Sequence, residues 1–230
     1  MIKIIFDHTE GFGKVTDNDF IYSDPKGIAL SKDYINYLEA GWIEWGKYWY
    51  NLRSVRLNIN KYSPSKTTKK LSNKITYINK LLTYDIVKKL ESIYNSYIEK
   101  HQFKRDINLE DFVKAKNFFV LLYYKDDSLI GANIYKIYRQ IDETAFVSYQ
   151  FLWDYNDPKL SLGNVSQFYE IEFAKSMDCK YVYLLGGYET KSIYKSNFKG
   201  FEWWTGSIWS TDVEMYKSLC LRDDNVHIRT

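Results

Sequence analysis

Cysteine and proline are scarce in this chain, which holds two cysteines and three prolines among 230 residues. Cys179 and Cys220 lie far apart and form no Cys-x-x-Cys pair, so their spacing predicts neither a disulfide framework nor a zinc site, and no metal is expected. No stretch approaches the roughly 18 apolar residues that span a membrane, and the first residues lack the pattern of a secretory signal. These absences favour a cytoplasmic protein without a membrane partner.

Charge of either sign is also in little excess, because 32 lysines and arginines face 29 aspartates and glutamates, for a net charge of +3 at pH 7. This balance is too mild to identify a nucleic-acid partner, so the positions of the lysines matter more than their number. At roughly 100 to 200 residues per domain, the length corresponds to one domain, alone or with a small subdomain. Hydrophobic residues make up 45% of the chain, which suffices for a core.

Aromatic residues, by contrast, are abundant at 18% of the chain, and 22 of them are tyrosines. An AT-rich genome, which favours tyrosine codons, would explain this excess. Alternatively, the rings form a binding site, because tyrosine combines a stacking face with a hydrogen-bonding tip. Composition favours the first explanation, so only the placement of particular rings is informative.

Hydrophobic periodicity predicts both helices and strands. Helices are expected between a cap at Ser31 and a glycine stop at Gly41, at 82–101, 109–115 and 164–178, and from the capping box Thr211-x-x-Glu214 onward. Strands are expected at 2–6, 118–124, 129–138, 144–152 and 180–185, and the aromatic stretch 42–50 is expected to form a hairpin or extended layer that runs into 55–59. The lysine-rich residues 63–74 are expected to form a solvated loop.

The order of these elements is typical of an α+β fold, because helices come first, then strands joined by short turns, then a helix that feeds another strand. It resembles the acyltransferase fold of the GNAT superfamily, a central, mostly antiparallel twisted sheet flanked by helices. We expect residues 1–75 to form a small N-terminal aromatic and basic segment, and residues 76–230 to form the GNAT-like domain.

Residues 148–184 carry a more specific pattern. A Tyr-x-Phe strand, an aromatic-Asp loop, Ser-Leu-Gly, a Glu-Ile-Glu helix and a Tyr-Val-Tyr-Leu strand follow one another, starting at Tyr149, Trp153, Ser161, Glu170 and Tyr181. This series resembles the core of the aminoacyl-tRNA-protein transferases, the arginyl- and leucyl-transferring enzymes of the N-end rule. Further matching pieces are Gly41-Trp42, the basic segment 62–70, a helix that ends in Tyr-x-x-x-His at His101, and Lys191-Ser-Ile-Tyr-Lys195.

Two segments depart from the family pattern. The cysteine cluster of the family is missing between Tyr50 and Val55, and the loop 186–190 is shorter than in the family. The family is expected to recognise its acceptor at these places, so the resemblance does not identify the acceptor.

The resemblance implies an aminoacyltransferase that moves an amino acid from aminoacyl-tRNA to an amine acceptor and forms a peptide or amide bond. The acceptor is a protein N-terminus, a peptide or a small metabolite. Aminoacyl-tRNA is the co-substrate, and no other cofactor is expected. Because the ester is already activated, the enzyme has mainly to position two groups and assist the loss of an amine proton.

Three catalytic candidates come from the matched core. Asp154 leaves the third meander strand where the cleft of such a fold opens, although a loop-capping aspartate is the alternative. Glu170 and Glu172 cannot share one helix face, and we expect Glu170 to face the cleft and Glu172 to face solvent. Tyr149 shares a strand face with Phe151 by the period of two, so it lines either a substrate pocket or the core.

Binding candidates come from the lysines and rings of the matched segments. Spaced cations in a flexible polar loop suit a phosphate backbone, although a simple surface loop is the alternative; these tRNA-binding candidates are Lys66, Lys69, Lys70 and Lys74. Rings and cations near the cleft suit a terminal phosphate and a stacked adenine; these substrate-binding candidates are Trp153, Tyr188, Lys191, Tyr194 and Lys195.

Two other functions stay open from the sequence. One is an acetyl-CoA-dependent N-acetyltransferase of the same fold, and the other is an RNA-binding protein without catalysis. Gly163 is the single glycine where a coenzyme A-binding acyltransferase would place paired glycines, which argues against a pyrophosphate nest. The oligomeric state is not indicated.

Overall fold

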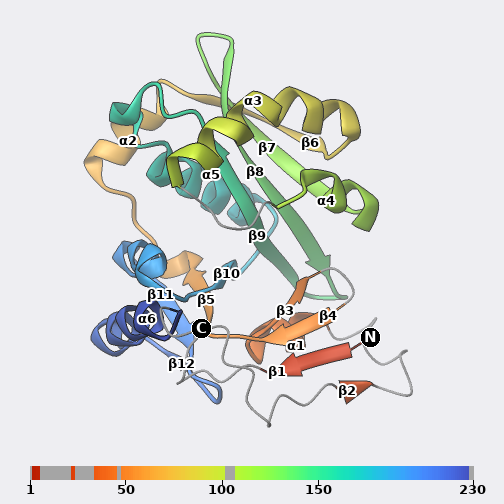
Figure 1. Ribbon diagram of the computed structural model, residues 1–230, viewed down its shortest axis with the longest axis vertical. Coiled ribbons are helices and arrows are strands. Elements are labelled where there is room, and N and C mark those ends of the chain that lie inside the picture. Colours follow the sequence, from red (N-terminus) through yellow and green to blue (C-terminus); the bar gives the residue numbers. More distant parts are fainter. Residues whose placement is uncertain (1, 6–21, 24–33, 46–47, 102–106, 228–230) are drawn as a thin grey trace. The chain divides into compact units, whose positions relative to one another are not determined.

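The computed structural model describes residues 2–5, 22–23, 34–45, 48–101 and 107–227. The chain divides into two compact units, each assembled from separate stretches (Figure 1). The first unit comprises Met1–Tyr62, Tyr138–Ala145 and Asp178–Thr230, and the second unit comprises Ser63–Ile137 and Phe146–Met177. The boundary expected between residues 75 and 76 stays a prediction, and the cap expected at Ser31 lies outside the described residues.

The strands of the first unit form two groups. In one group the order is β2-β1-β4-β3, where β1 is parallel to β4 and the other neighbours are antiparallel. In the other group the order is β12-β11-β5-β10, and all neighbours are antiparallel. The strands are β1 (Ile2–Ile5), β2 (Tyr22–Ser23), β3 (Trp42–Trp45), β4 (Tyr48–Asn51), β5 (Ser54–Asn58), β10 (Tyr181–Gly186), β11 (Phe201–Trp204) and β12 (Trp209–Ser210).

The helices of the first unit are α1 (Tyr34–Glu39) and α6 (Val213–His227), with the 3-10 helices η2 (Ile59–Lys61) and η4 (Thr190–Asn197). The glycine stop of α1 is confirmed, because Gly41 has a φ of +77° and a Cβ atom there would collide with the Trp204 ring. The predicted cap of α6 is wrong by one residue. Asp212 Oδ1, not the Thr211 side chain, accepts the backbone N–H of Met215 at 2.9 Å, since aspartate caps a helix as well as threonine does.

A buried ion pair joins distant segments of the first unit. Arg53 and Asp223 are both 0% exposed, and their side chains meet at 2.7 Å. Asp223 also accepts the backbone N–H of Glu189 at 3.0 Å, and the backbone N–H of Arg53 donates to the hydroxyl of Tyr188 at 2.9 Å. Neither charge is left unpaired, which is the condition for burying both.

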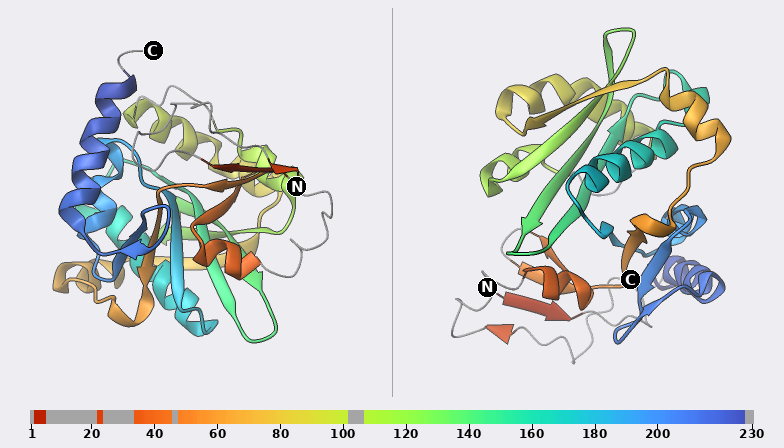
Figure 2. Two further views of the ribbon diagram at one scale, coloured as in Figure 1. Left: turned by 90° about the horizontal axis from the view of Figure 1, so that it is seen from below. Right: turned by 180° about the vertical axis from the view of Figure 1, so that it is seen from behind.

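The second unit is built on a sheet of order β9-β8-β7-β6, in which β6 is antiparallel to β7 and β7 to β8. One face of this sheet packs against α5 and the other against α4 (Figure 2). Its elements are α2 (Lys66–Ser72), β6 (Thr76–Leu81), α3 (Tyr84–His101), α4 (Leu109–Ala115), β7 (Phe118–Lys125), β8 (Ser128–Arg139), β9 (Thr144–Trp153), the 3-10 helix η3 (Pro158–Leu160) and α5 (Leu162–Ser176).

Aromatic packing fills the α5 face of this sheet. Tyr135 of β8 stacks on Phe146 of β9 with ring centres 4.5 Å apart, and Phe173 of α5 packs edge-on against Tyr135 at 5.7 Å. The rings of Tyr123 in β7 and Tyr169 in α5 are stacked, with their centres 6.2 Å apart. Several of the abundant aromatic rings are therefore part of the core.

The predicted α+β class and most predicted elements are confirmed. The solvated loop expected at 63–74 is wrong, because Lys66–Ser72 forms helix α2. The Ser65 hydroxyl caps this helix by accepting the backbone N–H of Thr68 at 3.0 Å, and the side chains of Thr68 and Ser72 are buried. The elements β6, β11, β12 and η4 were not expected.

Candidate active site

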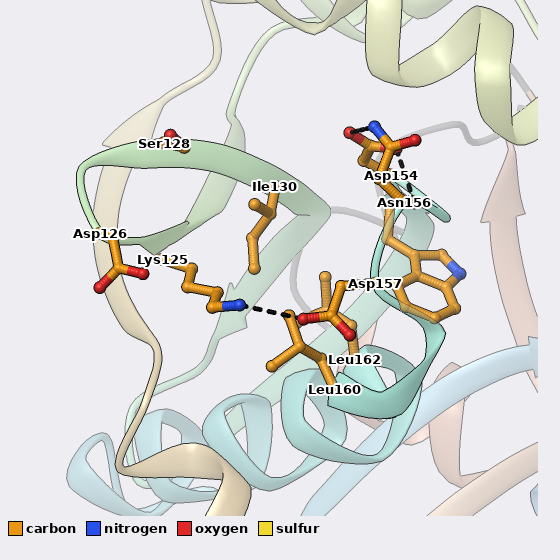
Figure 3. A pocket seen from close by; sticks show the side chains of 10 residues that line it. Lys125, Asp126, Ser128, Ile130, Asp154, Asn156, Asp157, Leu160 and Leu162 are labelled. Carbon is orange, nitrogen blue, oxygen red and sulfur yellow. Dashed lines mark hydrogen bonds and ion pairs between the residues drawn. The ribbon is translucent and has the colours of Figure 1, made fainter.

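A pocket of about 240 Å³ lies in the second unit where β9 ends (Figure 3). Apolar side chains line it from β8, η3 and the start of α5, namely Ile130, Leu160 and Leu162. Trp153 and Asp154, from the end of β9 and the residue after it, also line the pocket. An apolar pocket with a few convergent polar groups is the usual form of a small-molecule site.

Asp154 is fixed at this pocket by its neighbours. Its backbone N–H donates to the carbonyl oxygen of Ile130 at 2.9 Å, which continues the pairing of β9 with β8. Its carboxylate accepts the backbone N–H of Asn156 at 3.0 Å and the Asn156 side-chain amide at 2.7 Å. The capping bonds expected of a loop aspartate and the pocket position expected of a catalytic one thus occur together.

Lys125 and Asp157 form an ion pair at the same pocket, with Nζ 2.9 Å from Oδ2 (Figure 3). Their hydrogen bond raises the pKa of Lys125 and lowers the pKa of Asp157. Sequence reasoning missed both residues. The signal for Asp157 was its place before Pro158 in the matched loop, whereas nothing in the sequence singled out Lys125.

A second group of rings lies beside Trp153. The Tyr155 ring centre is 4.3 Å from that of Trp153, and the Tyr155 hydroxyl is hydrogen-bonded to Nε2 of His101. Tyr97, one turn before His101 on α3, packs against the imidazole at 4.6 Å. Burial lowers the pKa of His101, and the neighbouring Lys100 lowers it further. The matched Tyr-x-x-x-His motif therefore lies next to the pocket, although His101 was not predicted as a site residue.

Glu170 lies in a different place, inside the second unit between α5 and the sheet. Its side chain is buried, and burial raises its pKa to about 8, against the effect of the Ser148 hydroxyl, which lowers it. Glu172 is exposed and pairs with Lys175 at 2.7 Å. Glu172 therefore faces solvent as expected, whereas Glu170, which was expected to face the cleft, is buried and does not line the pocket.

Tyr149 is on the opposite face of the sheet from Glu170. Its ring packs edge-on against Phe118 at 4.9 Å and against Phe112 of α4 at 6.2 Å. Phe151 instead contacts Tyr123, on the α5 face, at 6.5 Å. The expected shared face of Tyr149 and Phe151 is wrong, because the alternation of β9 breaks between them.

Three of the four candidate tRNA-binding lysines belong to helix α2. Lys66, Lys69 and Lys70 are spaced three and four residues apart, so all three lie on one exposed face of the helix. Lys74 is exposed just beyond the helix end. We name Lys66, Lys69 and Lys70 the lysine ridge.

The other binding candidates lie in the first unit, where Tyr188 is buried, Lys195 is partly buried, and Lys191 and Tyr194 are exposed. Tyr188 is buried and faces the Arg53 guanidinium. Lys195 Nζ donates to the carbonyl oxygens of Leu184 and Gly186, each at 2.7 Å, and burial lowers its pKa to about 8. Lys191 pairs with Glu189 on the surface. Tyr194 is exposed as well, with 57% of its surface accessible to solvent.

No helix within the described residues is long and apolar enough to cross a membrane. No cluster of three or more His, Cys, Asp or Glu side chains in that part of the chain is arranged to hold a metal ion.

Several solved structures align with the chain at low identity. The C-terminal domain of a putative lysylphosphatidylglycerol synthetase from Agrobacterium fabrum is 9% identical at a TM-score of 0.47, covering 62% of this chain and 49% of its own. L-PGS from Bacillus licheniformis is 10% identical at a TM-score of 0.46, and the alignment covers 66% of this chain and 49% of L-PGS. A GNAT family acetyltransferase from Staphylococcus aureus is 18% identical at a TM-score of 0.36, and the alignment covers 46% of this chain and 84% of the acetyltransferase. The chain thus spans about half the length of the first two.

The family comparison is more specific. No curated protein matches the sequence. Residues 83–205 match the family model for the arginine-tRNA-protein transferase, C terminus, and this range is more than half of the 230 residues. It contains every residue that lines the pocket, as well as His101 and Glu170. As the resemblance predicted, the chain belongs to the arginine-tRNA-protein transferase family.

Proposed function

We propose that this protein transfers the amino acid of an aminoacyl-tRNA to an amine, which is a protein N-terminus, a peptide or a small metabolite. The observation that carries the proposal is the family match over residues 83–205, because this stretch contains the whole pocket at the end of β9. The pocket offers an apolar lining for a side chain and a carboxylate, that of Asp154, for a proton.

The proposed reaction needs no oxidant, reductant or metal. The amine nitrogen attacks the ester carbonyl carbon, a C–N bond forms, and the C–O bond to the ribose breaks. The amine loses one proton and the ribose oxygen gains one. We assign Asp154 as the proton acceptor, held in place by the amide groups of Asn156. Positioning of the two reactants supplies much of the rate.

For tRNA binding we assign the lysine ridge. A helix face that presents cations three and four residues apart can neutralise neighbouring phosphates, and each neutralised phosphate releases counterions. This contact fixes the RNA without reading its sequence. Binding is therefore expected to weaken steeply as the salt concentration rises.

The test is transfer from a pool of charged tRNA to a peptide with a free N-terminus, followed by mass spectrometry. We expect the peptide to gain the mass of one amino-acid residue, and we expect ribonuclease treatment of the tRNA to abolish the gain. Asp154→Asn should slow transfer about 100-fold or more. Asp85→Asn, which changes an exposed aspartate of α3, is the matched control and should keep the wild-type rate.

An acetyl-CoA arm separates the rival activity. If acetyl-CoA gives a modified peptide and charged tRNA gives none, the proposed donor is wrong. If neither donor gives a product while tRNA still binds at low salt, the protein is an RNA-binding protein without this activity.

A further inference from the structure

Four aromatic or imidazole rings gather beside the pocket of the second unit. Trp153 ends β9 and Tyr155 follows it by two residues, whereas Tyr97 and His101 lie one turn apart at the end of α3. The ring centres of Trp153 and Tyr155 are 4.3 Å apart. The His101 imidazole lies 5.3 Å from the Tyr155 ring and 4.6 Å from the Tyr97 ring. We name Tyr97, His101, Trp153 and Tyr155 the ring cluster.

The ring cluster lies at the surface, unlike the rings of the core. None of its four side chains is buried, and His101 is exposed. The core rings Tyr123 and Phe146, by contrast, are both 0% exposed. Rings that contact one another at the surface keep part of their faces and edges open to a ligand, and aromatic side chains commonly line binding sites.

The ring cluster combines uncharged rings with one cation. The Lys100 ammonium lies 5.9 Å from the centre of the Tyr155 ring. Burial lowers the pKa of His101 and the neighbouring Lys100 lowers it further, so the imidazole is an uncharged flat ring at pH 7. The carboxylate between Trp153 and Tyr155, that of Asp154, accepts the two N–H groups of Asn156. A flat ligand with an anionic group fits this combination.

We propose that the ring cluster binds the base of the last nucleotide of the donor tRNA, an adenosine, and that Lys100 contacts the phosphate of that nucleotide. The inference rests on the proposed function. Unpaired RNA bases bind to proteins by stacking on aromatic and imidazole rings, next to cations that contact the phosphates. The last nucleotides of tRNA are unpaired, so their bases are open to such contacts.

The position of the ring cluster agrees with this ligand. The reacting ester is attached to the ribose of the last nucleotide, so the base lies within one nucleotide of the reacting carbonyl carbon. Trp153 provides this continuity, because it lines the pocket and also contacts the Tyr155 ring. Tyr188 and Tyr194, the other rings that the sequence suggested for substrate binding, belong to the first unit, and Tyr188 is buried.

Packing alone is the competing explanation. The ring cluster also joins the end of α3 to the loop after β9, and a lysine in the last turn of a helix is favourable without any ligand. Packing predicts that loss of a ring affects the binding of every RNA equally or not at all. A base site predicts a loss that is confined to RNA that carries the terminal base.

Filter binding of uncharged tRNA tests the inference without the transfer reaction. The two probes are intact tRNA and the same tRNA from which the terminal adenosine has been removed. We expect the wild-type protein to bind the shortened tRNA about tenfold more weakly, because the stacking of one base is lost. Tyr155→Leu should bind intact tRNA about tenfold more weakly than the wild type does, and should bind the shortened tRNA equally well.

Matched variants separate the ring from the hydroxyl and from folding. Tyr155→Phe keeps the ring and loses the hydrogen bond to His101, so it should keep the preference for intact tRNA. Tyr84→Leu, at an exposed tyrosine of α3, is the control and should behave as the wild type does. Lys100→Gln should reduce the slope of log affinity against log salt by about 1 for intact tRNA. Circular dichroism shows whether each variant is folded.

A fluorescent base reports stacking in the wild-type protein directly, so this readout needs no variant. When 2-aminopurine replaces the terminal adenine, its fluorescence should be quenched on binding, because stacking quenches this base. Tyr155→Phe should quench it as well, whereas Tyr155→Leu should not.

The outcomes distinguish this inference from the proposed function. Equal affinity of the wild type for the two tRNAs, unquenched 2-aminopurine, or a loss in Tyr155→Leu that is the same for both tRNAs would overturn the base site in favour of packing. If transfer is observed alongside such a result, only the base site is wrong. A preference for the terminal adenosine without transfer retains the base site and rejects the proposed activity. If neither tRNA binds, the base site and the proposed donor are both wrong.

Discussion

The hydroxyl of Tyr169 lies 2.8 Å from the carbonyl oxygen of Ser72 and 2.7 Å from that of Ile75, and so joins α5 to the end of α2. Thr68 and Ser72 are the buried residues of α2, so they mark the side of this helix that faces the protein. The helix of the lysine ridge is therefore joined to α5, whose first residue, Leu162, lines the pocket.

We predict that Tyr169→Phe destabilises the protein by about 1 to 2 kcal/mol, because it removes the single hydroxyl hydrogen that the carbonyl oxygens of Ser72 and Ile75 share. Since α2 loses its tie to α5, tRNA affinity should fall as well. Urea unfolding and filter binding measure the two effects. Tyr84→Phe, at an exposed tyrosine, is the control. Equal stability of the two variants would show that these hydrogen bonds are not needed.

The lysine ridge gives a second prediction. Lys69→Gln combined with Lys70→Gln should weaken tRNA binding, and should reduce the slope of log affinity against log salt by about 2, one for each lost phosphate contact. Lys88→Gln combined with Lys89→Gln removes the same charge from an exposed part of α3. If both pairs of substitutions have the same effect, net charge rather than the ridge governs binding.

Stability should depend on pH through Glu170. Its pKa is raised from 4.5 to about 8 in the folded state, so the folded protein keeps a proton that the unfolded chain loses. Stability is therefore greatest below pH 4.5 for this group, falls by at most about 1.4 kcal/mol per pH unit, and levels off above pH 8.

Glu170→Gln should remove that dependence, because glutamine does not titrate, whereas Glu172→Gln should retain it. Urea unfolding of the three proteins at pH 5, 6, 7 and 8 makes the comparison. Parallel pH profiles for wild type and Glu170→Gln would contradict the raised pKa.

Removal of one buried charge in the first unit should also destabilise the protein. Asp223→Asn leaves the Arg53 guanidinium without its carboxylate, at a cost of about 3 to 5 kcal/mol. Thermal unfolding measures the loss. Glu214→Gln, which removes an exposed carboxylate that pairs with Lys217 on the same helix, should change stability by less than about 1 kcal/mol. Similar losses in both variants would contradict the importance of the Arg53–Asp223 pair.

Sequence patterns predicted those helices and strands that are determined by residues close together in the sequence. The amphipathic spacing of 82–101 gave α3, and the short turns gave the meander of β7, β8 and β9. The spacing of Glu170 and Glu172 indicated that the two carboxylates face different ways, and Glu172 is exposed whereas Glu170 is buried. In each case the deciding interactions are close in sequence.

The predictions were wrong where contacts between residues far apart in the sequence determine the local structure. Residues 66–72 read as a solvated run of lysine, serine and threonine, but contacts with α5 bury Thr68 and Ser72 and stabilise a helix there. The face of Tyr149 was misjudged because a break in the alternation of β9 has no sequence signal. The two carbonyl groups that accept hydrogen bonds from Lys195 lie at an irregular end of β10, where Leu185 has a φ of +60°, and no sequence pattern indicated this contact.

Lys191 and Lys195 are only four residues apart, yet their ammonium groups differ in what can reach them. The Lys195 ammonium is held inside the first unit by two main-chain oxygens, whereas that of Lys191 is on the surface. Amine-reactive labels should therefore modify Lys191 rapidly and Lys195 only when this part of the chain unfolds. The labelling rate of Lys195, read by peptide mass spectrometry, reports local opening of the first unit.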